Sequence, residues 1–89
     1  MHIKANNTVF DANQFPIFFV EGEGVSFLSL DTMKLHMRVS SEYKAEQVFD
    51  RITGAIANGN RALLDLDRDF KVIDVFADHI TPITNALAA

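Results

Sequence analysis

Cysteine and tryptophan are absent from the 89 residues, and there are only two prolines and four glycines. Small secreted domains usually rely on disulfides, so the lack of cysteine favours a reducing compartment. Residues 1–7 contain no apolar stretch of the kind that a signal peptide needs. The longest apolar run, Ile17 to Val20, is far too short to span a bilayer. We therefore expect a cytoplasmic protein with no membrane-spanning segment.

Positive charge is also scarce. Eight Lys and Arg residues stand against 12 Asp and Glu residues, which gives a formal net charge of −4. A surface that binds nucleic-acid phosphates requires an excess of positive charge. The charge balance therefore argues against a nucleic-acid partner.

Motifs for metals, cofactors and catalysis are missing from the sequence. The three histidines, His2, His36 and His79, lie far apart and show no metal-ligand spacing. Residues 21–24 alternate glutamate and glycine, which puts negative charge where a phosphate-binding loop would hold phosphate. The sequence therefore predicts no metal and no cofactor. It favours a protein that is not an enzyme, although catalytic groups can also assemble from distant parts of a chain.

The composition is that of a folded domain. Hydrophobic residues make up 48% of the chain and charged residues 22%, far from the polar mixture of disordered proteins. The length suits one domain, and no repeat or linker divides it. We expect residues 1–89 to form a single α+β domain.

Strand signals dominate the first half of the chain. Asn6-Asn7 tolerates the positive φ of a tight turn, so the residues on either side are predicted to form a hairpin. Residues 15–20 form a further predicted strand, with Pro16 at its start or on an exposed edge because proline has no backbone N–H. Residues 25–30 and 33–39 follow, and the second of these alternates apolar and basic residues without a break.

The second half begins with a predicted helix over residues 40–58, where apolar residues recur every three or four positions. Residues 61–67 return to the alternation of a strand. Residues 71–80 fit either a strand or a helix, and the β-branched residues favour a strand over 71–76. A short helix is predicted from Thr81. The expected fold is an antiparallel β-sheet of about five to seven short strands packed by one long amphipathic helix, in the order β-β-β-β-β-α-β-β-α.

The hairpin over residues 25–39 supplies the predicted protein-binding surface. A two-residue loop at Asp31-Thr32 would pair Phe27 with His36 and gather apolar and basic side chains on one face. These residues are Val25, Phe27, Lys34, His36 and Arg38. Such a mixed surface suits contact with an acidic protein partner. The alternative is that the same chain covers Val25 and Phe27 while the cationic side chains reach water.

The strand over residues 15–20 is apolar on both faces, with Phe18 and Val20 opposite Ile17 and Phe19. One long helix can cover only one of these faces. A second subunit is the simplest cover for the other, so we expect a homodimer.

These observations favour a non-enzymatic protein-binding module that self-associates and acts as an adaptor, a regulator or an inhibitor of a larger protein complex. Two alternatives remain open. The alternate spacing of Asp65, Asp67 and Asp69 is compatible with an acidic nucleic-acid mimic of the type found in phages and mobile elements. His36 on a strand is compatible with a small ligand-binding domain or an enzyme.

Overall fold

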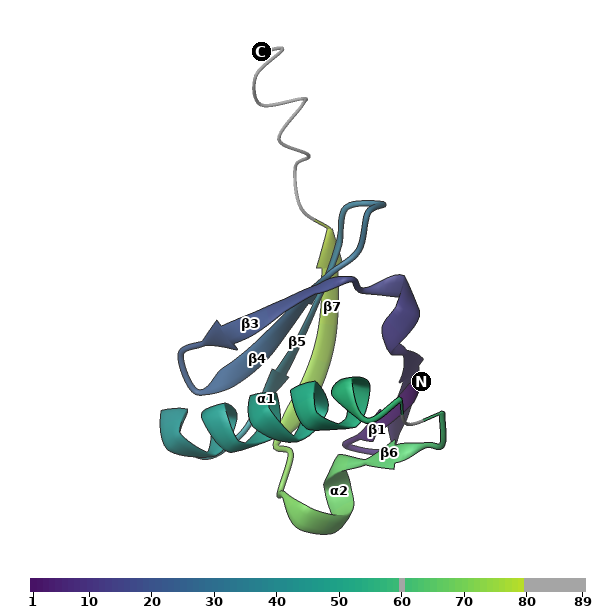
Figure 1. Cartoon of the computed structure of the whole chain (residues 1–89). Helices are drawn as coiled ribbons and strands as arrows, with labels where there is room; N and C mark the ends of the chain where they lie inside the picture. The colour runs from purple at the N-terminus through teal and green to yellow at the C-terminus, as the bar shows by residue number, and fades with distance from the viewer. Residues whose placement is uncertain (60, 80–89) are drawn as a thin grey trace.

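The chain folds as an α+β structure in which one long helix packs against antiparallel strands, which confirms the predicted fold class (Figure 1). The computed structural model describes residues 1–59 and 61–79. The elements are β1 (His2–Ala5), β2 (Thr8–Asp11), the 3₁₀ helix η1 (Ala12–Gln14), β3 (Ile17–Glu21), β4 (Gly24–Leu28), β5 (Met33–Arg38), α1 (Glu42–Ala57), β6 (Leu64–Asp65), α2 (Leu66–Asp69) and β7 (Asp74–His79). No helix among the described residues is long and apolar enough to cross a membrane.

Helix α1 lies where the apolar spacing places it. The Ser41 hydroxyl caps its first turn by accepting the backbone N–H of Lys44 at 3.1 Å. Ala45, Val48 and Ile52 recur at helical spacing and are fully buried. The helix is therefore held by one apolar stripe and leaves its opposite side in solvent.

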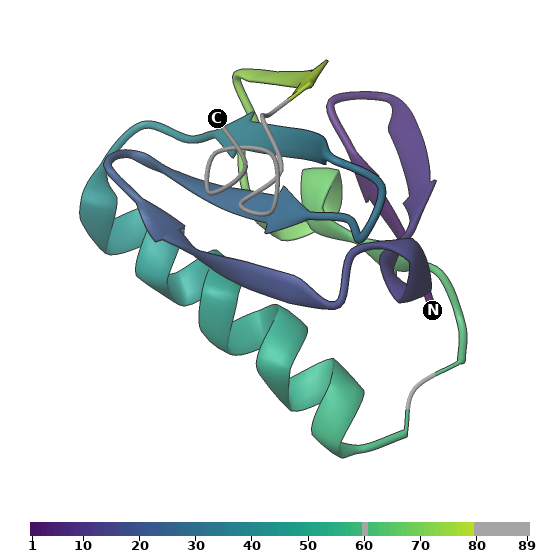
Figure 2. The same ribbon diagram turned by 90° about the horizontal axis from the view of Figure 1, so that it is seen from above.

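The strands divide between two sheets. Strands β2, β1 and β6 form one sheet, in which β6 pairs parallel to β1, and β3, β4, β5 and β7 form a four-stranded antiparallel sheet. Figure 2 shows the order of the four-stranded sheet from above, with β3 at the side nearer α1 and β7 at the opposite edge.

The first hairpin forms as predicted. Asn6 and Asn7 have φ values of 49° and 57°, the left-handed backbone of a two-residue turn. The Asp67 carboxylate accepts the N–H groups of both turn residues, at 2.6 and 3.0 Å. A residue distant in sequence thus anchors the turn to α2.

The core lies between the four-stranded sheet, α1 and the smaller sheet. Phe27 of β4 is its largest fully buried side chain and contacts the rings of Phe10, Phe15 and Phe18. Phe49 of α1 reaches the same cluster through Phe18, with ring centroids 5.3 Å apart. Aromatic packing therefore joins the helix to β3 and β4.

Residues 61–80 differ in part from the expectation. The predicted strand over residues 61–67 is reduced to β6, because the chain turns into α2 at Leu66 to bury that side chain. The ambiguous segment contains a strand, β7, but it begins at Asp74, three residues later than the strand favoured over 71–76. The helix predicted from Thr81 lies outside the described residues.

Candidate functional site

The β4–β5 hairpin is shifted by one residue from the predicted register. Phe27 pairs with Leu35, and Ser26 pairs with His36. The shift arises in the loop, where the Ser29 N–H donates to the Met33 carbonyl at 2.9 Å, so the connection is longer than Asp31-Thr32. Because side chains alternate along a strand, a shift of one residue moves every β4 side chain to the other face relative to β5.

In the observed register, the five residues predicted to bind a protein lie on two different faces of the sheet. Val25 and Phe27 are 0% and 1% exposed and belong to the core, so the prediction that they share a face with the basic residues is wrong. Lys34, His36 and Arg38 do lie together, on the face turned away from α1. The alternative that the chain itself covers Val25 and Phe27 is confirmed.

We call the side of the four-stranded sheet opposite α1 the open face. Its side chains are defined by the register of the four strands and are Ile17, Phe19, Glu21, Ser26, Leu28, Lys34, His36, Arg38, Asp74, Phe76 and Asp78. Sequence reasoning missed most of these, since the partners of the basic residues depend on the hairpin register. The sequence pattern over 74–79 does not alternate polar and apolar residues, so it gave no signal that Phe76 shares this face with Asp74 and Asp78.

Two ion pairs neutralise the long basic side chains of the open face. Lys34 Nζ lies 2.8 Å from Glu21 Oε1, and Arg38 Nη2 lies 2.8 Å from Asp74 Oδ2. The hydrogen bond from Lys34 is the main cause that lowers the pKa of the Glu21 carboxyl. The hydrogen bond to Asp74 raises the pKa of Arg38. Both cations therefore have acidic partners within the chain.

A transverse row of four residues crosses the centre of the open face. Register pairing places Phe19, Ser26, His36 and Phe76 side by side, one from each strand. Ser26 Oγ lies 2.7 Å from His36 Nδ1, and the His36 ring lies 5.6 Å from the Phe76 ring. The row has an aromatic ring at each end and a hydrogen-bonded pair between them.

The chemistry of this row does not suit nucleophilic catalysis. A nucleophilic serine needs a hydroxyl that substrate can reach, and Ser26 is fully buried. A hollow of about 230 Å³ opens beside His36 and is lined by Glu21, Lys34, His36, Phe76 and Asp78. Lys34 Nζ donates to Glu21 Oε1, and His36 Nδ1 is hydrogen-bonded to Ser26 Oγ.

The backbone of β3 is exposed along one side. The Ser29 N–H donates to the Met33 carbonyl, and the Val39 N–H donates to the Glu23 carbonyl. The odd-numbered residues from 23 to 29 therefore turn their backbone N–H and C=O groups toward β5. Even-numbered β4 residues therefore bond to Ile17, Phe19 and Glu21.

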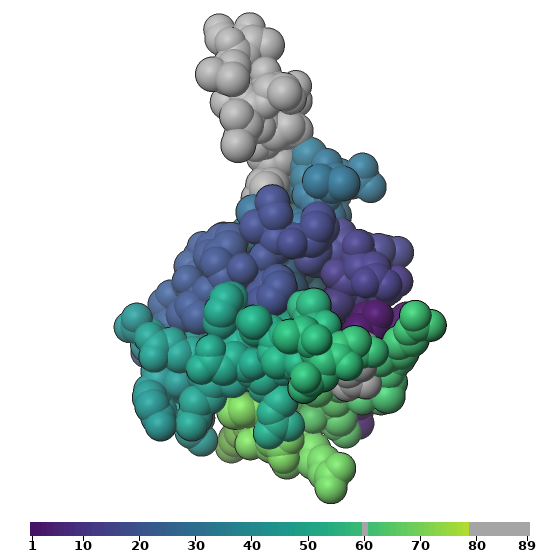
Figure 3. All heavy atoms as spheres, viewed as in Figure 1, coloured from purple at the N-terminus to yellow at the C-terminus, as the bar shows by residue number. Residues whose placement is uncertain are grey.

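Phe18 and Val20 consequently direct their backbone N–H and C=O groups away from the sheet. No strand pairs with that side of β3 among residues 1–59 and 61–79. We call this row of backbone groups the β3 edge. Figure 3 shows atoms of strand β3 at the surface, in a band directly above α1.

The two edges of the sheet differ in chemistry. Strand β7 carries Asp74 and Asp78, charges of the kind that discourage strand addition. Strand β3 is apolar from Ile17 to Val20 and has one acid, Glu21, at its end. Ile17 is 53% exposed. The β3 edge is therefore the side of this sheet that lacks protection.

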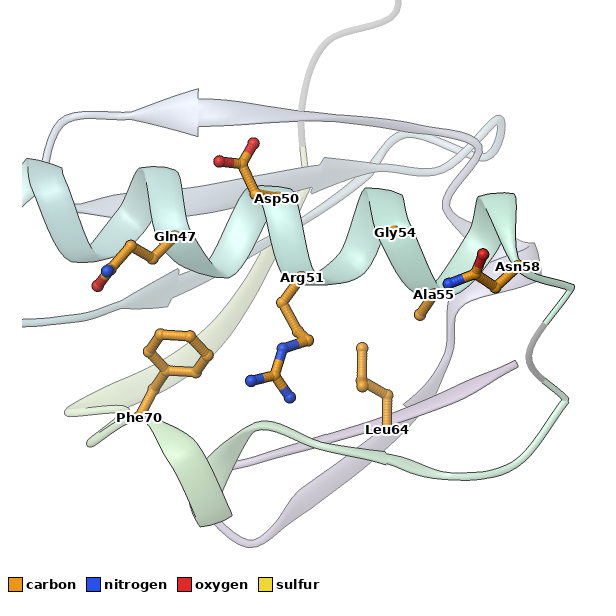
Figure 4. A pocket seen from close by; sticks show the side chains of 8 residues that line it. All are labelled: Gln47, Asp50, Arg51, Gly54, Ala55, Asn58, Leu64 and Phe70. Atoms are coloured by element: carbon orange, nitrogen blue, oxygen red, sulfur yellow. The ribbon is translucent and has the colours of Figure 1, made fainter.

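A second hollow lies between α1 and the β6–α2 segment (Figure 4). Arg51 points into it from α1, with Nη1 2.6 Å from Asp69 Oδ2 and its guanidinium 5.8 Å from the Phe70 ring centroid. Leu64 closes the far wall. The arginine is thus held by an acid and an aromatic ring, and the contact fastens α2 to α1.

The three spaced aspartates are used within the fold. Asp65 lies 3.9 Å from Lys4, Asp67 binds the turn of the first hairpin, and Asp69 pairs with Arg51. Asp67 and Asp69 lie in α2 and not on a strand. Nothing in this arrangement presents the three carboxylates as one row.

No group of three or more metal-ligating side chains occurs in the part of the chain that the structure describes. No protein-family model, curated protein or solved structure matches this chain. The open face and the β3 edge are the features of the described residues from which a function can be inferred.

Proposed function

We propose that this chain is a non-enzymatic protein-binding module of the cytoplasm that self-associates, and that its contact surface is the β3 side of the open face. The observation that supports this proposal is an apolar edge strand whose outward backbone groups pair with no strand among the described residues. An adaptor, a regulator or a small inhibitor of a larger complex would each use such a surface.

The side chains next to the β3 edge favour a protein partner. Ile17 and Phe19 lie on the open face at this edge, and Leu28 adjoins Ile17 on β4. Glu21 and Lys34 form an ion pair beside them. An apolar centre with charged groups at its border is the usual composition of a protein–protein contact.

The test compares two aromatic residues of the same transverse row. Phe19→Lys places a charge at the β3 edge, and Phe76→Lys places the same charge at the β7 edge as a matched control. We expect the wild-type chain to associate in sedimentation velocity, Phe19→Lys to weaken association at least tenfold and Phe76→Lys to leave it unchanged. Circular dichroism checks that both variants are folded.

Other outcomes count against the proposal. A wild-type chain that remains monomeric at millimolar concentration would remove self-association. If both variants weaken association equally, the contact covers the whole open face and is not confined to its β3 side. If neither variant weakens association, the open face takes no part in the contact.

A further inference from the structure

We infer that two copies of this chain pair through β3 as antiparallel strands, with Phe19 facing Phe19 of the second copy across a two-fold axis. The two four-stranded sheets then continue into one. This inference rests on the proposed function and names its partner and geometry.

The backbone chemistry of the β3 edge identifies the occupant as an extended polypeptide. Phe18 and Val20 each present one N–H and one C=O to the outside. Only another strand supplies donors and acceptors at the matching spacing. A flat apolar surface or a helix would leave these groups without partners.

A two-fold axis at Phe19 satisfies all of these groups. In this register Phe18 pairs with Val20 of the second copy, Val20 pairs with Phe18 of the second copy, and each pair exchanges both hydrogen bonds. Because β3 is its own complement in this arrangement, a second copy of the chain fits without any further segment.

Neighbouring registers satisfy fewer groups. An axis at Phe18 sets Val20 opposite Pro16, which has no N–H to donate. An axis at Val20 sets Phe18 opposite Gly22, which lies in the turn after β3 with φ of 59°. The turn backbone does not continue the strand, so the hydrogen-bond ladder is incomplete in both cases.

The side chains support the same register. On the open face the two Phe19 rings form a cross-strand aromatic pair. On the other face Val20 of the second copy lies beside Phe18, which contacts Phe49 of α1. An apolar crevice of about 220 Å³ continues from Phe18 and Pro16 to Ile56, which is half exposed. A strand added outside β3 covers this crevice and removes apolar surface from water.

The absence of cysteine makes the register directly testable, since each introduced thiol is the only one in the chain. Residues facing each other in a non-hydrogen-bonded antiparallel pair have Cα atoms about 4.5 Å apart, within the range of a disulfide. Phe19→Cys is therefore expected to form a disulfide-linked dimer in most of the protein under mild oxidation. Phe76→Cys, on the opposite edge, is expected to remain monomeric on a non-reducing gel.

A second pair of variants tests the register without altering Phe19. The proposed pairing sets Ile17 opposite Glu21 of the second copy and separates the two Ile17 residues by about 13 Å. Ile17→Cys alone is therefore expected not to cross-link, whereas a mixture of Ile17→Cys and Glu21→Cys is expected to give the heterodimer.

The outcomes separate this inference from the proposed function. If wild-type chains associate but Phe19→Cys cross-links no faster than Phe76→Cys, the β3 pairing is wrong and the binding module stands. Cross-linking of Ile17→Cys with itself likewise contradicts the register alone. A strictly monomeric wild-type chain contradicts both.

Discussion

The hydroxyl oxygen of Ser26 lies 2.7 Å from Nδ1 of His36, on the face of the sheet that α1 leaves uncovered. Ser26 is the one buried polar residue among those described, with 0% of its surface exposed. The two residues belong to different strands and meet only because β4 and β5 pair in the observed register. Their contact is thus a direct consequence of that register.

Replacement of Ser26 by alanine is expected to lower the free energy of unfolding by about 1 kcal/mol, the typical net contribution of one hydrogen bond. Urea denaturation of Ser26→Ala and of Ser40→Ala provides the measurement, because Ser40 is exposed. Equal midpoints for the two variants would show that the Ser26–His36 contact adds nothing.

Gly24 and Gly54 are expected to respond in opposite directions to alanine. A Cβ at Gly24 would lie 2.3 Å from the Met37 carbonyl oxygen and 2.6 Å from His36 Nε2, so Gly24→Ala must displace the neighbouring strand. We expect it to destabilise the chain by about 1–3 kcal/mol, as overpacking does. A Cβ at Gly54 meets no atom within 4 Å, so Gly54→Ala is expected to stabilise α1 by about 0.5–1 kcal/mol. Thermal unfolding of the two variants decides the point, and a loss from Gly54→Ala would contradict it.

Thr32 holds a backbone conformation that suits glycine. Its φ is 74°, a left-handed value that a β-branched residue adopts at a cost. Thr32→Gly is expected to raise the free energy of unfolding by about 1 kcal/mol. Thr8→Gly, in strand β2, serves as the control and is expected to lower it. A lower midpoint for Thr32→Gly in guanidinium would refute this assignment of strain.

The Glu21–Lys34 pair is expected to make stability depend on acid pH. The hydrogen bond from Lys34 lowers the pKa of the Glu21 carboxyl below its ordinary value of 4.5. A carboxyl with a lower pKa in the folded state stabilises that state above pH 4.5 and loses this contribution as the pH falls through its folded pKa. The effect is small because both side chains are partly exposed.

Glu21→Gln is therefore expected to flatten the decline of unfolding free energy below pH 4.5 and to leave its pH dependence near neutrality unchanged. Urea titrations at about six pH values between 3 and 7 measure this difference. Glu46→Gln, an exposed position of α1, is the control. If both variants follow the wild-type curve in acid, the ionisation of Glu21 does not contribute to the pH dependence of stability.

Local patterns predicted several elements to within one or two residues. The helix expected over residues 40–58 spans 42–57, because its capping serine and apolar stripe lie close together in sequence. The tight turn at Asn6-Asn7 depends on the backbone preference of asparagine and forms where expected. Pro16 immediately precedes an edge strand, as its missing N–H requires.

The candidate site was only partly predictable. The alternation over residues 33–39 placed Lys34, His36 and Arg38 on one face, since that relationship lies within a single strand. Which β4 residues joined them depended on the loop, and the loop contains a threonine in a conformation that its side chain does not favour. The sequence pattern pointed to a shorter loop, and the predicted partners Val25 and Phe27 were wrong for that reason.

The amino-acid sequence alone determined the periodicity of α1 and of the strands before it, because a strand or helix repeats over neighbouring residues and its side chains follow that repeat. The tertiary structure decided how the strands pair, that β6 joins β1 in parallel and that Val25 and Phe27 face α1. These relationships compare residues far apart in the chain. Their free energies depend on which face the helix buries, and no local pattern contains that information.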